Sequence, residues 1–268
     1  MYISHWALNR KPFENTPDPA FLFFDSQHEE GLARMLYVVR AEKGLGLLSG
    51  VFGCGKTVLS RALYKELEKD IYRVAFITNP RGEDIDVLRL IAHNLGAQEL
   101  PQRKSDVLIL IEKIVIDNWR DEKKTVIIID EAHAINDPGV FEEVRLLLNF
   151  QLDNKFLLTI IFIGQPELRE KLGQNIQLSQ RIALRYHLEP FTRENTEAYV
   201  GHRLKVAGAE RDIFTAEALD MIYASSGGIP RRINQLCDMA LTIGFGRGSS
   251  VADAVTVKEA IDTLGGGE

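Results

Sequence analysis

One stretch of the sequence combines glycines, a lysine and a hydroxyl at the spacing that holds a phosphate group. Residues 50–57 read GVFGCGKT, which fits the pattern G-x-x-x-x-G-K-[ST]. Glycines let successive main-chain N–H groups curve around an anion, and the N-terminus of a following helix adds a favourable dipole. An apolar run precedes the loop and a helical pattern follows it, which disfavours a chance glycine-rich turn. We predict nucleotide binding by these residues: Gly50, Gly53, Cys54, Gly55, Lys56, Thr57 and Val58.

Two members of this loop carry contacts that depend on the side chain. Lys56 is expected to reach the β- and γ-phosphates of a nucleotide, and the Thr57 hydroxyl is expected to hold Mg²⁺. Cys54 fits as a small residue at a variable position, and a redox-sensitive thiol at the helix N-terminus is the alternative.

A second group of polar residues follows an apolar run directly. Residues 125–135 read TVIIIDEAHAI, so Asp130 and Glu131 come at the end of a predicted buried strand. There, Asp130 is expected to orient Mg²⁺ and its waters, and Glu131 to polarise a water for attack on the γ-phosphate. His133 completes the letters DEAH, and two interpretations stay open for it: coupling the site to the later parts of the chain, or simple packing and capping.

The elements that must position these residues alternate between strands and helices. Short apolar runs predict strands at 45–49, 73–78, 126–129, 157–163 and 184–188, with helical patterns between them. This alternation predicts an α/β fold with a parallel five-stranded sheet. Between the phosphate-loop strand and the DEAH strand lies one extra strand candidate, 73–78. We assign it as the added central strand that is typical of NTPases with a catalytic glutamate.

The pattern changes near residue 190, where strand-like runs stop. Helical segments are predicted at 193–207, 215–225 and 230–246, and a fourth begins with the capping box Thr256–Glu259. We therefore predict an α/β nucleotide-binding domain at 1–190 and a small all-helical domain at 191–268. A DEAH helicase needs a second lobe with its own strands, and the absence of a second set of strands argues against that class.

Composition and charge narrow the classes of protein to which the sequence can belong. Of the 268 residues, 45% are hydrophobic and 26% are charged, which is ordinary for a globular protein. A run of about 18 apolar residues is missing, so no membrane segment is expected. Only two cysteines occur, which fits a reducing cytoplasm. The net charge of −6 does not indicate a general nucleic-acid binder, although this total does not exclude a local basic pore.

Three further pieces of sequence, with four polar side chains, fit a site shared between subunits. Gln165 follows the predicted strand 157–163, where its amide would lie beside the γ-phosphate. Arg181 and Arg185 come just before the last predicted strand, and Arg231 follows Gly-Ile-Pro at a helix start. For each arginine taken alone, a solvated surface charge is the alternative.

In this order the motifs resemble an AAA+ ATPase over nearly the whole chain. The resemblance implies a P-loop core followed by a helical lid, with ATP and Mg²⁺ as ligands and subunits that associate around the nucleotide. Gln165 takes the sensor 1 position, where Asn or Thr is commoner. Arg181 resembles the arginine finger that reaches a neighbouring subunit, with Arg185 as the alternate. Arg231 resembles the sensor 2 arginine of the lid.

A closer resemblance is to the ExeA/GspA family, the A-component ATPases of type II secretion and related pilus systems. It rests on the opening residues 1–32, on IGQPEL (163–168), on LSQRIALRYHLEPF (178–191) and on GGIPRRINQLCD (227–238). It implies an energy-supplying or assembly ATPase with a secretion or pilus protein as partner. Residues 24–28 become candidates for adenine binding, whereas core packing is the alternative for the aromatic cluster Phe21, Phe23 and Phe24.

The secretion protein continues into a membrane helix and a periplasmic region, whereas this sequence stops at Glu268. We expect either a cytosolic domain of a longer protein or a short relative, held at the inner membrane by a partner or by the missing region. The core is also similar to transposition regulators such as Mu B and TnsC. That similarity makes an ATP-dependent DNA-binding assembly factor the alternative function.

Overall fold

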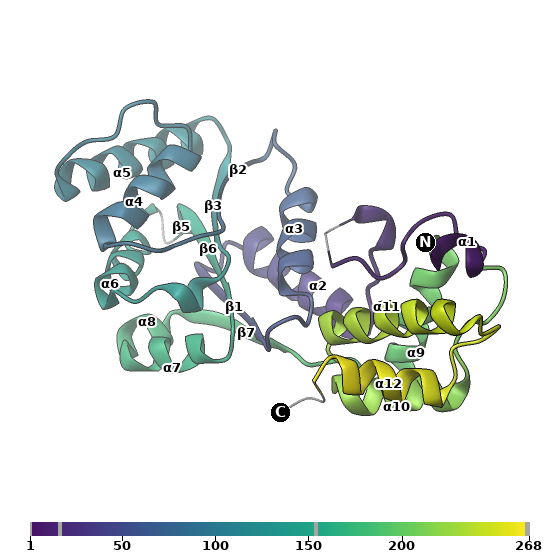
Figure 1. The fold of residues 1–268 in the computed structure, drawn as a ribbon. Helices are drawn as coiled ribbons and strands as arrows, with labels where there is room; N and C mark the ends of the chain where they lie inside the picture. Colours follow the sequence, from purple (N-terminus) through teal and green to yellow (C-terminus); the bar gives the residue numbers. More distant parts are fainter. Residues whose placement is uncertain (1, 16–17, 153–154, 266–268) are drawn as a thin grey trace. The chain divides into compact units, whose positions relative to one another are not determined.

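A five-stranded parallel sheet forms the centre of the computed structural model, which describes residues 2–15, 18–152 and 155–265. The strands are β1 Leu45–Gly50, β2 Tyr72–Ile77, β3 Lys124–Ile129, β6 Leu158–Gly164 and β7 Ile182–Leu188 (Figure 1). A short hairpin, β4 Gln151–Leu152 and β5 Lys155–Phe156, precedes β6. The predicted α/β class and its parallel sheet are confirmed.

The spatial order of the strands is β2-β3-β6-β1-β7. The strand between the phosphate-loop strand β1 and the DEAH strand β3 is therefore β6, and the run at 73–78 forms the edge strand β2. Assigning the added central strand to 73–78 was wrong. Strands follow one another along the chain in a different order from their order in the sheet, and apolar runs of similar length do not encode the spatial order.

Helices cover both faces of this sheet (Figure 1). One face packs on α2 Ser26–Arg40 and α3 Lys56–Glu66, and the other packs on α4 Asp84–Asn94, α5 Lys104–Arg120, α6 Pro138–Leu147, α7 Glu167–Gln174 and α8 Ile176–Gln180. Alternate strand residues serve the two cores: Ile127 and Ile129 face α4–α8, whereas Val126 and Ile128 face α2 and α3. Burial on both faces explains why the strands are apolar without alternation.

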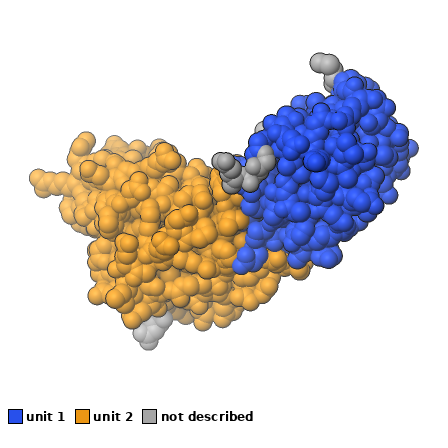
Figure 2. Space-filling view, turned by 60° about the horizontal axis from the view of Figure 1, so that its bottom comes forward, with its two compact units in different colours: residues 1–25, 53–55, 189–268 blue, residues 26–52, 56–188 orange. Residues whose placement is uncertain are grey.

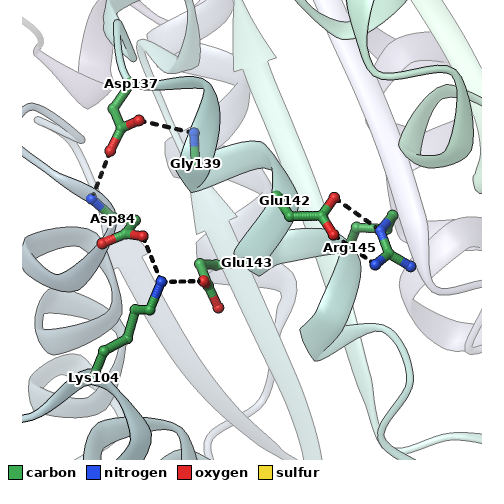
Figure 3. Close-up of polar contacts among 7 residues, drawn as sticks. All are labelled: Asp84, Lys104, Asp137, Gly139, Glu142, Glu143 and Arg145. Carbon is green, nitrogen blue, oxygen red and sulfur yellow. Dashed lines mark hydrogen bonds and ion pairs between the residues drawn. The ribbon is translucent and has the colours of Figure 1, made fainter.

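Polar side chains join the starts of α4, α5 and α6 (Figure 3). Lys104 Nζ donates to Asp84 Oδ2 at 2.8 Å and to the buried Glu143 Oε1 at 2.7 Å. Asp137 caps α6 by accepting from the Gly139 N–H at 2.8 Å, and it also accepts from the Asp84 N–H at 3.0 Å. These bonds fix helix starts near the edge of the sheet where the strands end.

The chain divides into two compact units (Figure 2). Unit 2 comprises residues 26–52 and 56–188 and contains the sheet, and unit 1 comprises residues 1–25, 53–55 and 189–268. Unit 1 contains α1 Tyr2–His5, the 3₁₀ turn η1 Pro19–Phe21, α9 Arg193–Val206, α10 Ala216–Ser226, α11 Pro230–Arg247 and α12 Ala254–Thr263. The units differ from the predicted domains in residues 1–25, 53–55 and 189–190, all of which group with the helices.

The N-terminal segment packs into the core of the helical unit. Trp6 is buried and donates from Nε1 to the Leu241 carbonyl at 2.9 Å. Further along, Arg203 Nη2 donates to the Glu14 carbonyl at 2.9 Å, and the Asn9 N–H donates to the Ala207 carbonyl at 2.8 Å. These long-range bonds explain why residues that precede the sheet in sequence belong to another unit.

The last helix starts one turn earlier than predicted. Asp253 is the N-cap of α12, because its side chain accepts from the Thr256 N–H at 2.9 Å. Thr256 therefore lies inside the first turn, and its assignment as the cap was wrong. Across the described stretches of the chain, none of the helices combines the length and the apolar character needed to span a bilayer.

Candidate functional site

The loop from Gly50 to Thr57 joins the end of β1 to the start of α3. Gly53 and Gly55 have φ of +85° and +102°, a backbone region that favours glycine and turns main-chain N–H groups toward one side. Lys56 is the first residue of α3, is 5% exposed, and donates from Nζ to the Val51 carbonyl at 2.9 Å. The strand–loop–helix context predicted for this motif is confirmed.

The remaining loop residues differ in their exposure. Cys54 is buried, Thr57 is exposed, and Val58 is partly buried. The thiol of Cys54 therefore packs inward, in agreement with a small residue that fills the loop.

Asp130 lies at the carboxyl end of β3, almost fully buried at 1% exposure. Its Oδ2 accepts from Ser60 Oγ at 2.9 Å, and its Oδ1 accepts from the Glu131 N–H at 2.9 Å. Burial raises the pKa of Asp130 above its ordinary value, whereas these two hydrogen bonds oppose the rise. A cation near this carboxylate would favour its charged form for the same electrostatic reason.

Glu131 follows with an unusual backbone, at φ +55° and ψ +31°. This left-handed conformation is uncommon for a side chain larger than glycine or asparagine. It ends the strand and starts the 3₁₀ turn η2, Ala132–Ala134. The Glu131 carboxylate remains partly exposed, with Oε2 3.5 Å from His133 Nε2.

Gln165 follows the end of β6, as predicted, and lies against the same turn. Its side-chain amide nitrogen is 2.8 Å from His133 Nε2, and its main-chain N–H faces His133 Nδ1 at 3.4 Å. A Cβ on Gly164 would lie only 3.1 Å from the main-chain nitrogen of His133 and 2.8 Å from Leu168 Cδ2. Glycine at this position therefore permits the turn to lie close to the end of β6. The structure therefore brings Glu131, His133 and Gln165 together.

Lys171 of α7 holds the main chain of that turn. Its Nζ donates to the His133 and Ile135 carbonyls, both at 2.6 Å, and to Asn136 Oδ1 at 3.2 Å. Sequence reasoning missed this residue, because a lysine several positions after IGQ carries no motif.

Ser60 was missed too, although a signal for it exists. It lies three residues after Thr57 and is fully buried between the apolar positions Leu59 and Leu63 of α3. A hydroxyl on the buried face of the helix that follows a phosphate loop requires a polar partner, and that partner is Asp130.

The two arginines near β7 lie away from the phosphate loop. Gly50 pairs with Leu188 at the carboxyl end of β7, whereas Arg181 precedes the first residue of this seven-residue strand. At about 3.3 Å per residue, Arg181 is roughly 20 Å along the strand from that end. Arg181 Nη1 donates to the Arg145 carbonyl of α6 at 3.3 Å.

Arg185 lies inside β7, as it does inside the predicted run 184–188, so its placement before the strand was wrong. The strand begins two residues earlier than its apolar run indicates, because its edge position leaves several side chains exposed. Arg185 is itself exposed and donates from Nη2 to the Ser179 carbonyl at 2.7 Å.

Arg231 belongs to unit 1 and is the second residue of α11. Its main-chain N–H faces the Gly53 carbonyl at 3.4 Å, and a Cβ on Gly53 would lie 2.9 Å from Arg231 Cβ. Residues 53–55 belong to the same unit, so the structure places this predicted lid arginine beside the tip of the loop.

The aromatic cluster near the N-terminus contributes to packing. Phe21 lies in the core of unit 1, and Phe23 makes edge-on ring contacts with Phe191 and Tyr199. Core packing is thus confirmed for these two rings. Among the adenine candidates at 24–28, Asp25 accepts from Asn195 Nδ2 at 2.8 Å.

Comparison with known proteins agrees with the two family resemblances that the motifs indicate. A family model described as "AAA domain" matches residues 39–172. The chain is 40% identical over 255 residues to general secretion pathway protein A of Aeromonas hydrophila, a match that covers 93% of this chain and 46% of that protein. The chain therefore spans less than half of that relative's length, and the resemblance to this secretion family is confirmed over the part aligned.

Solved structures share the fold at low sequence identity. The Drosophila ORC bound to DNA matches with a TM-score of 0.72 at 18% identity, covering 97% of this chain and 66% of that chain. The Aeropyrum pernix ORC2 protein in its ADPNP-ADP complexes matches with a TM-score of 0.67 at 17% identity, covering 97% and 72%.

Proposed function

Since the chain belongs to the AAA domain family, we propose that it binds ATP with Mg²⁺ at residues 50–57 and hydrolyses the ATP, releasing the γ-phosphate. The observation that carries this proposal is the gathering of Lys56, Asp130, Glu131 and Gln165 at the carboxyl ends of β1, β3 and β6. In parallel α/β sheets, ligands bind at that edge.

The loop fits the phosphates of a nucleotide. Gly53 and Gly55, with their positive φ, form a concave arrangement of main-chain N–H groups that suits an anion. Among the residues that the structure describes, the ammonium of Lys56 donates to a carbonyl of its own loop and forms no ion pair, so it can exchange that bond for phosphate oxygens. Positive charge at this position stabilises the β- and γ-phosphates.

The residues present also fit Mg²⁺. This ion usually keeps several waters and binds through one or two protein oxygens together with the phosphates. The exposed Thr57 hydroxyl and the Asp130 carboxylate are oxygens of that kind, and Ser60 fixes the orientation of the carboxylate. When bound, Mg²⁺ neutralises charge on the phosphate oxygens.

Glu131 is our choice for the general base. Its partly exposed carboxylate can accept a proton from water, whereas the carboxylate of Asp130 is buried and bonded on both oxygens. Gln165 would detect the γ-phosphate through its amide. In unit 1, Arg231 would bind phosphates next to the loop tip and favour ATP over ADP.

Arg181 is proposed to act on a neighbouring subunit. Its position roughly 20 Å along β7 from the loop end is too far for an arginine side chain to reach its own site. A finger provided in trans makes hydrolysis a property of assemblies, with Arg185 as the alternate finger. Arginine fingers contribute about 10³–10⁵-fold in rate.

The proposed setting is a bacterial type II secretion or pilus apparatus, in the cytoplasm or held at the inner membrane by a partner. The support is the 40% identity to general secretion pathway protein A. A DNA-binding assembly factor is the alternative function. A titration with duplex DNA, with and without ATP, separates the two, because only the alternative predicts ATP-dependent binding.

Two variants with matched controls test the site. Lys56→Ala should weaken ATP binding, whereas Lys65→Ala, which changes an exposed lysine of the same helix, should not.

Glu131→Gln should bind ATP but slow phosphate release by at least ~10²-fold, the usual loss for a general base. Glu122→Gln is its control, because Glu122 shares the left-handed backbone at φ +58° but precedes β3. Near wild-type turnover in Glu131→Gln would refute the assignment.

A further inference from the structure

The imidazole of His133 lies between two side chains to which the proposed function gives different tasks. Its Nε2 is 3.5 Å from Glu131 Oε2 and 2.8 Å from the side-chain amide nitrogen of Gln165. The ring is 18% exposed, so water competes weakly for these contacts. One ring therefore touches both the expected general base and the expected γ-phosphate sensor.

The contacts of the ring determine where its proton lies. The main-chain N–H of Gln165 faces Nδ1, which makes Nδ1 the acceptor and puts the proton on Nε2 in the neutral ring. The Nε2–H then has two acceptors within reach: the Glu131 carboxylate, and the amide oxygen of Gln165 after a half-turn of that amide. A single N–H cannot form a full hydrogen bond with both acceptors at once.

We propose that His133 transmits the state of Gln165 to Glu131, as a positioning residue for hydrolysis. This inference rests on the proposed function. Without a γ-phosphate, the Gln165 amide bonds the ring and competes with Glu131 for Nε2–H. When the amide turns to a γ-phosphate, Nε2–H is left to Glu131 alone and holds its carboxylate in one orientation. The proton stays on the ring throughout, so no group changes its charge.

A purely structural role for the ring is the competing explanation, and the turn itself argues against it. Lys171 holds the carbonyls of His133 and Ile135 from α7, independently of the imidazole. The main chain of η2 should therefore keep its course when the ring is replaced by a smaller polar side chain.

Two amide variants separate the nitrogens of the ring. In His133→Asn, the amide can take the place of Nδ1 but is too short to reach Glu131, whereas in His133→Gln it extends to the place of Nε2. A hydrogen bond to a charged group is worth about 10- to 100-fold in a rate constant. We expect His133→Asn to lower kcat by about that factor while the Kd for ATP changes less than about 2-fold, and His133→Gln to recover part of the loss. Equal kcat values for the two variants would overturn the proposal.

A double-mutant cycle tests the connection to Gln165. If the ring acts through Gln165, His133→Asn combined with Gln165→Ala should lower kcat no further than the more severe single change. Losses that multiply would show independent roles and overturn the relay. If wild type hydrolyses ATP, Glu131→Gln does not, and the two losses of the cycle are additive, the relay is refuted while the proposed function stands. If wild type neither binds nor hydrolyses ATP, the proposed function fails and the relay fails with it.

The ring proton gives a readout besides activity. In protein labelled with ¹⁵N-histidine, the His133 signal is identified among six histidines by its loss in His133→Asn. We expect the Nε2–H form without nucleotide, and a shift of that proton on addition of a non-hydrolysable ATP analogue but not of ADP. The Nδ1–H form, or equal responses to both nucleotides, would contradict the proposal.

Discussion

Gly228 and Gly227 form a natural pair for testing the packing of the helical unit. Both have a left-handed backbone, with φ of +59° at Gly227 and +72° at Gly228. A Cβ on Gly227 would meet nothing within 4 Å. A Cβ on Gly228 would overlap the Phe191 carbonyl oxygen, with the Phe191 nitrogen at 3.1 Å. The Phe191 N–H also donates to the Gly228 carbonyl at 2.9 Å, so the two main chains cannot separate freely.

The expected losses result from this difference. Alanine in the left-handed region costs roughly 1–2 kcal/mol, which is the whole loss expected for Gly227→Ala. Gly228→Ala adds a forced main-chain shift of about 1–3 kcal/mol and the weakened bond to Phe191, about 1 kcal/mol. The free energy of unfolding of this unit should therefore fall by about 3–6 kcal/mol in Gly228→Ala.

The assay can be confined to the helical unit. The chain has two tryptophans, and Trp6 is buried in unit 1 whereas Trp119 lies on α5 of unit 2. In a Trp119→Phe background, Trp6 fluorescence during urea unfolding reports on unit 1 alone. Equal losses in the two alanine variants would refute the packing of Gly228 against Phe191.

Two further predictions concern the site. Arg181→Ala should bind ATP but hydrolyse little, and mixing it with Lys56→Ala should restore part of the phosphate release; no restoration on mixing would contradict a finger in trans. The raised pKa of Asp130 makes the unfolded chain ionise first, so the nucleotide-free wild type loses stability as pH rises from about 4 through the folded value. Asp130→Asn lacks this loss, so its free energy of unfolding relative to wild type should increase with pH over that range. Melting temperatures from about pH 4 to 7 check this, and parallel curves for wild type and variant would contradict it.

The sequence predicted the elements of unit 2 well, because buried parallel strands produce short apolar runs that glycine-rich and acidic motifs end sharply. Gly50, Asp130 and Gln165 all mark the ends of strands, and the structure has each of them at the end of its strand or directly after it. The spatial order of the strands was not predicted in the same way, since Ile160 and Ala75 lie in apolar runs of similar length and yet one strand is central and the other is at the edge.

Residues defined by long-range contacts were the ones missed. Trp6 packs beside Leu241, which is 235 positions away, and no local pattern in the opening segment indicates this partner. Ser60 and Lys171 each act through one hydrogen-bonding atom on a distant turn or strand end. Periodicity detects apolar faces, and it does not detect which polar atom lies opposite a given hydroxyl or amine.

A structure of the protein with Mg²⁺ and a non-hydrolysable ATP analogue tests the central claim most directly. The account predicts the terminal phosphates inside loop 50–57, with Lys56 Nζ moved from the Val51 carbonyl to a phosphate oxygen and Mg²⁺ beside Thr57 and Asp130. A nucleotide bound elsewhere, or one bound while Lys56 still donates to Val51, would contradict the account.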